Sequence, residues 1–402
     1  MKYIIVLADG MADEPIEQLN NRTPLEAANT PNFDILASKG EVGLVNTIPT
    51  GMIPGSDTAN LSVMGYDPMK YYTGRSPLEA ISIGANMKSD DVCFRINFVT
   101  LSEEGEFDEK TILDHSSEEI TTEEANQLLD VIKEHFENEV RHFYTGVSYR
   151  HALIWNGGSK EVNLTPPHDI LGQKITDSLP KGENGEFLYE MMKKSYDLLN
   201  NHPINEARRR KGLRVANCIW IWGEGTKPEL PSFMDMFNKK GAMISAVDLL
   251  KGIAIAAKMD SIDVEGATGN LHTNYQGKVD AAIKTLEEGN EFVYIHIEGP
   301  DECGHQGILE DKILAIELID EKVVGPLMKY FSETKQSFKL SVLPDHPTPI
   351  RIRTHTSEPV PYFIYDSSNE QNCTSTFDEK SALDSGRLIP NGYEFMPYFL
   401  GQ

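Results

Sequence analysis

Carboxylate and imidazole side chains follow three apolar segments of this sequence, at the points where buried strands are expected to end. The segments are residues 3–8, 292–297 and 338–343. The side chains that follow them are Asp9, Asp301, His305, Asp345, His346 and, nine residues further on, His355. Because parallel strands place their carboxyl ends at one edge of a sheet, we expect these side chains to converge there.

Imidazole and carboxylate together suit a borderline divalent ion such as Zn²⁺ or Mn²⁺. Any one of these residues alone is more often a helix cap or a polar loop residue than a metal ligand. Together they form two sets of three ligands, with Ser56 as a seventh group, which is enough for two metal ions. Two ions a few ångströms apart suit phosphoryl transfer, because they hold the attacking and leaving oxygens and offset the phosphate charge.

Ser56 lies in the segment Pro-Gly-Ser-Asp-Thr-Ala-Asn at residues 54–60, which is typical of a tight turn that opens a helix. One interpretation is an ordinary N-cap, in which the serine oxygen accepts from the first turn of the helix. The other is a nucleophile whose target group lies at the positive end of the helix. A neighbouring metal ion would favour the second, since coordination lowers the pKa of a hydroxyl.

The composition limits the partners of the chain. Its 402 residues carry a formal net charge of −25, which argues against nucleic acid or an anionic membrane as a partner. An anionic substrate would therefore need local positive charge from arginines or metal ions. The apolar run at residues 3–8 is too short for a signal peptide, and four scattered cysteines suggest a reducing compartment. We expect a cytoplasmic protein.

Apolar strand-like segments alternate with helical patterns along most of the chain. This alternation predicts an α/β fold with a mainly parallel sheet flanked by helices. The composition becomes rich in glutamate and aspartate over residues 102–139. A helix between short strands then suggests a small inserted α/β domain over residues 116–179, with the core formed by residues 1–115 and 180–402. One long helix is expected over residues 309–331.

Several motifs together resemble the alkaline phosphatase superfamily and, within it, the archaeal-type cofactor-independent phosphoglycerate mutases. They lie in the same order along nearly the whole chain, which makes the set specific to this family. The matching segments are residues 7–10, 23–28, 54–58, 65–68, 71–75, 200–203, 264–269 and 345–346.

This resemblance implies a mechanism and a ligand arrangement. One metal would be held by Asp9, Ser56, Asp345 and His346, and the other by Asp301, His305 and His355. Manganese is the ion expected first, with zinc or magnesium as alternatives, and no 2,3-bisphosphoglycerate is needed. Ser56 would take the phosphoryl group of 3-phosphoglycerate as phosphoserine and return it to give 2-phosphoglycerate, while the inserted domain closes over the substrate.

The resemblance also suggests side chains that hold the phosphate and carboxylate of this small anionic substrate. They are Arg75, Arg150, His168, Asp169 and Arg208. Arginine suits this role because its fork donates two parallel hydrogen bonds. The alternative for Arg75 is a surface arginine, and for Arg208, which begins the run 208–211, a solvated helix end.

Two departures from the family pattern bear on the substrate. Residues 112–119 contain no arginine where family members usually have several, and Pro344 and Pro347 flank the Asp-His pair in place of the usual glycine and serine. A homoserine kinase-like phosphotransferase or a phosphatase on the same two-metal scaffold is therefore an alternative. A catalytically silent binding protein is a third reading, which the complete ligand set disfavours.

Overall fold

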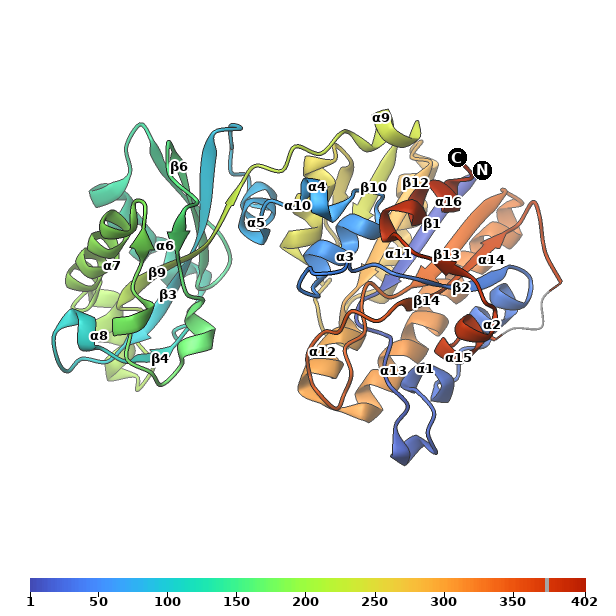
Figure 1. Cartoon of the computed structure of the whole chain (residues 1–402), viewed down its shortest axis with the longest axis horizontal. Coiled ribbons are helices and arrows are strands. Elements are labelled where there is room, and N and C mark those ends of the chain that lie inside the picture. Colours follow the sequence, from blue (N-terminus) through green and yellow to red (C-terminus); the bar gives the residue numbers. More distant parts are fainter. Residues whose placement is uncertain (373–375) are drawn as a thin grey trace. The chain divides into compact units, whose positions relative to one another are not determined.

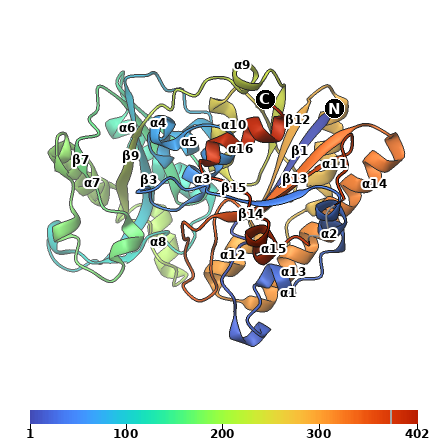
Figure 2. The same cartoon turned by 45° about the vertical axis from the view of Figure 1, so that its right-hand side comes forward.

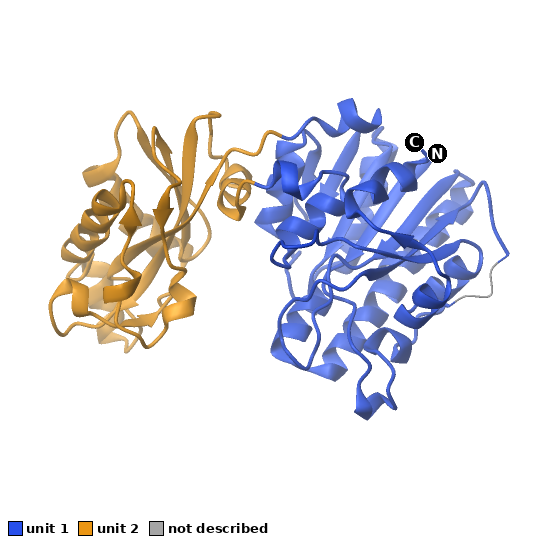
Figure 3. Ribbon diagram, viewed as in Figure 1, with its two compact units in different colours: residues 1–72, 230–402 blue, residues 73–229 orange. Residues whose placement is uncertain are grey.

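The computed structural model describes residues 1–372 and 376–402, and it divides into two compact units. Unit 1 contains residues 1–72 and 230–402, and unit 2 contains residues 73–229 (Figure 3). Cys373, one of the four cysteines, lies outside the described residues, whereas Cys93, Cys218 and Cys303 are buried free thiols. Within the described residues, no helix is both long enough and apolar enough to cross a membrane.

In the part of the chain that the structure describes, unit 1 contains an eight-stranded sheet in the order β11-β10-β12-β1-β13-β14-β2-β15 (Figure 1). Its central strand β1 pairs in parallel with β12 and β13, while β14 runs antiparallel to both of its neighbours. The strands are β1 (Lys2–Ala8), β2 (Glu41–Val45), β10 (Gly241–Ile244), β11 (Asp260–Ile262), β12 (Phe292–Ile297), β13 (Phe338–Leu343), β14 (Val360–Asp366) and β15 (Leu388–Ile389).

Strand β1 is buried on both faces, as its continuous run of β-branched and apolar residues predicts. Ile4, Val6 and Ala8 belong to a core shared with the helices on one face, and the alternating Ile5 and Leu7 are equally buried. That core contains side chains from α2, α11, α13 and α14. Figures 1 and 2 show helices covering both faces of the sheet. The predicted α/β class with a mainly parallel sheet is confirmed.

Several helices of unit 1 begin at a side chain that caps their first turn. Thr23 and Glu26, for example, form a reciprocal capping box with Pro24 as the first helical residue. The helices are α1 (Pro24–Ala27), α2 (Pro31–Ser38), α3 (Ser56–Val63), α4 (Pro68–Tyr71), α9 (Phe233–Phe237), α10 (Asp248–Ala256), α11 (Tyr275–Glu287), α12 (Gly299–Gln306), α13 (Leu309–Ile319), α14 (Gly325–Thr334), α15 (Glu379–Asp384) and α16 (Phe395–Leu400).

The single helix expected over residues 309–331 is interrupted. A π-helical segment, Asp320–Val324, separates α13 from α14. At its start the buried carboxylate of Asp320 accepts from the backbone N–H of Phe33, at 2.7 Å, and from the side chain of Asn32, at 2.9 Å. Asp320 therefore satisfies donors in the first turn of α2, a contact that the helical pattern of the sequence cannot show.

Unit 2 is built around an antiparallel sheet. Strand β3 pairs with β4, β6 and β9, and β5 adds to β6. The strands are β3 (Asp91–Leu101), β4 (Ile112–Asp114), β5 (Arg141–Thr145), β6 (Arg150–Asn156) and β9 (Cys218–Thr226), with a small pair β7 (Val162–Asn163) and β8 (Lys181–Gly182). The helices are α5 (Arg75–Ser82), α6 (Thr122–Phe136), α7 (Gly185–Leu199) and α8 (Pro203–Arg210).

Unit 2 extends beyond the insertion expected over residues 116–179. Strands β3 and β9, which that expectation assigned to the core, pair with each other along most of their length and belong to the sheet of unit 2. The two ends of the unit lie together: Thr73 Oγ1 donates to Thr226 O at 2.6 Å, and Thr226 N donates to Thr73 O at 3.2 Å. The insertion is therefore closed at its base by backbone and side-chain hydrogen bonds.

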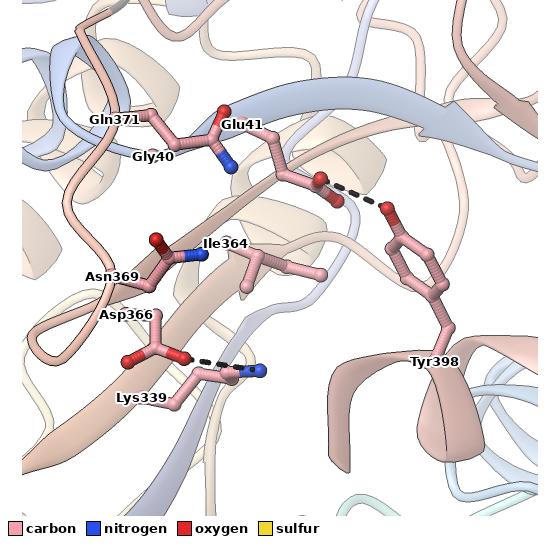
Figure 4. A pocket seen from close by; sticks show the side chains of 8 residues that line it. All are labelled: Gly40, Glu41, Lys339, Ile364, Asp366, Asn369, Gln371 and Tyr398. Carbon is pink, nitrogen blue, oxygen red and sulfur yellow. Dashed lines mark hydrogen bonds and ion pairs between the residues drawn. The ribbon is translucent and has the colours of Figure 1, made fainter. Parts of the chain in front are cut away.

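A small pocket lies in unit 1 at the amino ends of β2 and β13 (Figure 4). Lys339 pairs with Asp366 at 3.4 Å beside it, and the Tyr398 hydroxyl donates to Glu41 at 2.9 Å. Its lining residues are Gly40, Glu41, Lys339, Ile364, Asp366, Asn369, Gln371 and Tyr398. The pocket is therefore at the opposite end of these strands from the residues that follow β1, β12 and β13.

The Asp320 contact gives a stability prediction. Replacing Asp320 with Ala leaves the buried N–H of Phe33 without its acceptor, so we expect the free energy of unfolding to fall by about 1–3 kcal/mol. Chemical denaturation followed by circular dichroism measures the change. The control Lys329→Ala removes an exposed partner of Glu333 and should change stability by less than about 0.5 kcal/mol. An Asp320→Ala protein as stable as the control would contradict this role.

Candidate metal and phosphoryl-transfer site

The carboxyl edge of the sheet in unit 1 gathers the predicted carboxylates. Asp9 directly follows β1, Asp345 follows β13, and Asp301 lies in the first turn of α12, four residues after the end of β12. Because β12, β1 and β13 are adjacent and parallel, their carboxyl ends meet. Asp301 and His305 lie one helical turn apart on α12, so both reach the same place.

The first group contains Asp9, Asp345 and His346, which are buried, and the partly buried Ser56. His346 Nε2 lies 3.6 Å from Asp9 Oδ1 and 3.4 Å from Asp345 Oδ2. Candidate ligand atoms of Asp9, Asp345 and His346 all lie within 4.8 Å of one another. Ser56 Oγ lies 3.2 Å from His346 Nε2, so the hydroxyl belongs to this group.

The second group lies beside the first. His305 Nε2 is 3.3 Å from Asp301 Oδ2 and 2.9 Å from His355 Nε2, and His355 Nε2 is 3.4 Å from Asp301 Oδ1. The rings of His346 and His355 stack with their centroids 3.9 Å apart, which joins the two groups. All seven side chains singled out from the sequence therefore lie in one cluster of unit 1.

The side chain of Ser56 is directed to this cluster rather than to its own helix. Ser56 is the first residue of α3, and the N-cap position is Gly55, which has no side chain to cap with. Asn60, one turn later, donates to both Ser56 O, at 2.8 Å, and Asp345 Oδ2, at 2.9 Å. The capping interpretation of Ser56 does not hold, and the helix instead fixes the serine next to a ligand carboxylate.

The charges in the cluster favour a bound cation. Burial raises the pKa of Asp9, and the neighbouring carboxylates of Asp345 and Asp301 raise it further. Asp9 Oδ1 is buried and has no hydrogen-bond partner among the described residues. An ionised carboxylate in such a place is costly unless a cation lies beside it. The donor set of carboxylate oxygens and imidazole nitrogens fits divalent metal ions of the zinc or manganese type.

In the second group the charges are partly balanced within the protein. Burial would raise the pKa of Asp301, but hydrogen bonds from His305 and His355 outweigh it and hold that pKa well below its usual range. The same contact with Asp301 raises the pKa of His305 to about 9. His305 is therefore protonated at neutral pH without a bound metal, and it must release a proton to bind one.

Three further residues hold the ligands, and the sequence patterns did not single them out. His296, inside β12, approaches Asp9 Oδ2 at 2.8 Å through Nε2, while its Nδ1 lies 3.1 Å from Ser245 Oγ. Burial lowers the pKa of His296 to about 3, so the ring is neutral. Asn60 holds Asp345, and Thr348 Oγ1 donates to Asp301 Oδ1 at 2.5 Å. A polar residue inside an otherwise apolar strand was the available signal for His296.

Thr348 is itself anchored by a buried lysine. Lys312 Nζ donates to Thr348 O at 2.8 Å and pairs with Asp13 Oδ2 at the same distance. Asp13 also accepts from the backbone of Ile350, at 3.1 Å. Lys312 thus joins the loop that follows Asp9 to the loop that follows His346, and both loops carry ligands.

The residues expected to contact substrate lie in unit 2. Arg75, the first residue of α5, is half-exposed and donates from Nε to Glu79 Oε1 at 2.7 Å. Arg150 begins β6, with its guanidinium 5.4 Å from the Tyr149 ring. His168 and Asp169 lie on one short 3₁₀ turn, 3.7 Å apart, and both are about half-exposed.

Arg208 is placed differently from the other four. It is 3% exposed, and all of its donor groups have protein partners. Its Nε donates to Arg214 O and its Nη2 to Ser117 O, both at 2.7 Å, and its Nη1 pairs with Glu124. The guanidinium therefore holds three segments of unit 2 together and offers no free donor to a substrate, and it is neither a solvated helix end nor an exposed anion-binding side chain.

Comparison with known proteins agrees with these features. The fold of unit 1 and its cluster define an α/β protein with candidate ligands for divalent ions at the carboxyl edge of a mainly parallel sheet. Residues 37–205 match the family model described as 2,3-bisphosphoglycerate-independent phosphoglycerate mutase. The chain belongs to this family, because it is 46% identical over its full length to a curated relative, and the resemblance inferred from its motifs is confirmed.

Two curated relatives and two solved structures show how much of the chain is shared. The Geobacter sulfurreducens protein, named a probable 2,3-bisphosphoglycerate-independent phosphoglycerate mutase, is 46% identical over 100% of both chains. The Methanosarcina mazei mutase is 48% identical over 95% of each. A Pyrococcus horikoshii structure has a TM-score of 0.81 at 32% identity, covering 100% of this chain and 96% of that one. The cofactor-independent phosphoglycerate mutase of Thermoplasma acidophilum has a TM-score of 0.68 at 28% identity, covering 100% and 99%.

The pKa of His305 predicts how metal binding depends on pH. Because a ligating imidazole must be neutral, we expect Mn²⁺ affinity to rise as pH increases toward about 9 and to level off above it. Calorimetric titration of the metal-free protein in buffers of different ionisation enthalpy measures the proton released. His305→Asn should abolish that release, and an affinity independent of pH between 6 and 9 would contradict the assignment.

The hydrogen bond from Thr348 gives a second prediction for this site. Thr348→Val keeps the shape of the side chain but removes the donor to Asp301, so we expect Mn²⁺ affinity to fall by about 10- to 100-fold. The matched control Thr348→Ser keeps the hydroxyl and should stay close to the original affinity. Equal metal affinities for the valine and serine variants would show that this hydrogen bond does not position the ligand.

Proposed function

We propose that this chain is a phosphoglycerate mutase that interconverts 3-phosphoglycerate and 2-phosphoglycerate through a phosphoserine at Ser56. The observation that carries the proposal is the position of Ser56 Oγ, 3.2 Å from His346 Nε2 and within the cluster of candidate ligands. Family membership and the activity for which the relatives are named support the same function. In this proposal the protein acts in the cytoplasm, and its substrate is a small phosphorylated anion.

The ligand cluster would hold two divalent ions, with manganese expected first. Asp9, Ser56, Asp345 and His346 would hold one ion, and Asp301, His305 and His355 the other. When bound, such ions supply Lewis acidity that lowers the pKa of the serine hydroxyl and offsets charge on the phosphoryl oxygens. His296, Asn60 and Thr348 keep the ligand carboxylates in place before substrate arrives.

The reaction consists of two transfers that use the same serine. Ser56 Oγ forms a bond to phosphorus while the bond from phosphorus to the 3-oxygen of glycerate breaks, and that oxygen gains the proton that serine loses. The 2-oxygen of the retained glycerate then forms a bond to phosphorus while the bond from phosphorus to Ser56 Oγ breaks, and Oγ gains the proton that the 2-hydroxyl loses. The first turn of α3 begins at Ser56, so its N–H groups favour the negative charge of the phosphoserine.

Side chains of unit 2 would bind the anionic groups of the substrate and retain glycerate between the two transfers. Arg75 and Arg150 supply positive charge, and His168 and Asp169 supply polar contacts beside them. The buried Arg208 is not included in this set, because its donors are used within unit 2. Arg208 instead supports the loop that carries Ser117.

Removing the serine hydroxyl tests the covalent route. Ser56→Ala should lower the mutase rate by about 10³-fold or more, since it removes the oxygen that accepts the phosphoryl group in the proposed route. The control Ser62→Ala makes the same change on a buried residue of the same helix and should leave the rate nearly unchanged. Mass spectrometry of protein quenched during turnover should show one added phosphoryl group in the original chain and none in Ser56→Ala. Retained mutase activity in Ser56→Ala would exclude the route.

The identity of the substrate requires a separate comparison. The absence of arginine from residues 112–119 is the feature that favours the homoserine kinase-like alternative. The same manganese-loaded preparation is offered 3-phosphoglycerate alone, or homoserine with ATP. Formation of 2-phosphoglycerate supports the mutase, and phosphorylation of homoserine without mutase activity would replace it with the kinase.

A further inference from the structure

Arg95 lies at the centre of a group of positive charges in unit 2 that the sequence motifs did not reveal. It belongs to β3, where it pairs with Ala152 of β6 on one side and Trp222 of β9 on the other. Its side chain is only 16% exposed. Its Nε lies 3.0 Å from Glu79 Oε2, and its guanidinium carbon is 4.3 Å from the centre of the Trp222 ring.

A single carboxylate, Glu79, faces three guanidinium groups. Arg75 donates to its Oε1, Arg95 approaches its Oε2, and Arg150 also acts on its charge. Burial would raise the pKa of Glu79, but the three arginines outweigh it and lower that pKa. Burial lowers the pKa of Arg95, and repulsion from Arg75 and Arg150 lowers it further despite the attraction of Glu79.

The neighbouring titratable groups do not remove this excess of positive charge. His168 has its pKa lowered by burial and by the charges of His115, Arg95 and Arg75, with Asp169 acting in the opposite direction. Burial raises the pKa of Tyr149, which the charge of Arg150 lowers and the charge of Glu119 raises. Within residues 73–229, all of which are described, Glu79 is the only carboxylate in ion-pair contact with Arg95.

The guanidinium plane of Arg95 is held from two directions. Glu79 fixes its Nε edge, and the Trp222 ring supports its face. Trp222 is held in turn, because its Nε1 donates to Asn97 Oδ1 at 3.0 Å. Among the interactions of the described residues, Arg95 has an acceptor only for Nε, so Nη1 and Nη2 remain available to a ligand.

Arg75 and Arg150 are exposed, but Arg95 is largely buried and shares its one paired carboxylate, Glu79, with Arg75. A buried cation that is only partly neutralised favours a further anion, and Arg95 lies in a chain with a net charge of −25. We propose that Arg95 is an anion-binding residue of unit 2 that holds an oxyanion of the substrate, its carboxylate or its phosphate, through Nη1 and Nη2. Glu79 and Trp222 are the positioning residues for that guanidinium. The assignment rests on the proposed function, in which the substrate carries both kinds of oxyanion.

The test measures binding without turnover. Ser56→Ala protein loaded with Mn²⁺ is titrated calorimetrically with 3-phosphoglycerate, with Arg95 intact or replaced by Met. We expect Arg95→Met to weaken binding by about tenfold or more and to leave Mn²⁺ affinity unchanged. The control is Arg141→Met, which removes a guanidinium stacked 4.4 Å from the Phe187 ring in the same sheet and should bind normally. Unchanged 3-phosphoglycerate binding in Arg95→Met would overturn the proposal.

Arg95→Lys separates binding from a purely structural role. Lysine keeps the charge opposite Glu79 but lacks the fork, so it should restore thermal stability and still bind 3-phosphoglycerate several-fold more weakly. An Arg95→Lys protein with both the thermal stability and the 3-phosphoglycerate affinity of the original would overturn the proposal, even if Arg95→Met fails to fold.

Two further titrations identify the oxyanion. Glycerate carries only the carboxylate, and glycerol 3-phosphate carries only the phosphate. If Arg95→Lys loses binding of just one of these ligands, Arg95 is assigned to the oxyanion that this ligand carries. Equal binding of both ligands to the original and the variant would count against Arg95. The proposed mutase function fails by a different result, namely absence of turnover in the protein with Ser56 intact.

Discussion

The burial of Asp9 beside other carboxylates is the constraint on which the rest of the site depends. Three parallel strands bring their carboxyl ends together, and like charges then lie side by side with little water to screen them. Imidazole groups of His346 and His296 approach Asp9, yet one of its oxygens remains without a hydrogen-bond partner in the described chain. An occupied site would therefore stabilise the folded chain as well as serve its chemistry, since ligands that bind only the folded state stabilise it.

The sequence was sufficient for the parts of the site that depend on strand ends. A continuous apolar run followed by Asp9 identifies both a buried strand and the edge at which its last residue lies, and β13 with Asp345 follows the same rule. Ser56 could not be assigned in this way, because a serine at a helix start fits two roles. Only the position of Gly55 at the N-cap and of His346 beside the hydroxyl distinguishes them.

What the sequence could not provide depends on contacts between distant segments. His296 lies inside an apolar strand, and its role emerges only because Asp9 is on the neighbouring strand. The same holds for Arg208, for which the sequence suggested substrate binding or a solvated helix end, whereas its partners in the fold are Glu124 and Ser117. The extent of unit 2 was underestimated because β3 and β9, far apart in sequence, are indistinguishable from core strands until they are paired. Local patterns carry no information on such pairings.

The closed base of unit 2 has a consequence for how this family could diversify. Thr73 and Thr226 bring the entry and exit of the insertion side by side, so the segment between them begins and ends at nearly one point. A segment with adjacent ends can be lengthened, shortened or exchanged without altering the path of the chain that surrounds it. The cluster at the sheet edge draws no ligand from residues 73–229. Evolution could therefore alter substrate recognition in unit 2 while keeping the ligand cluster of unit 1.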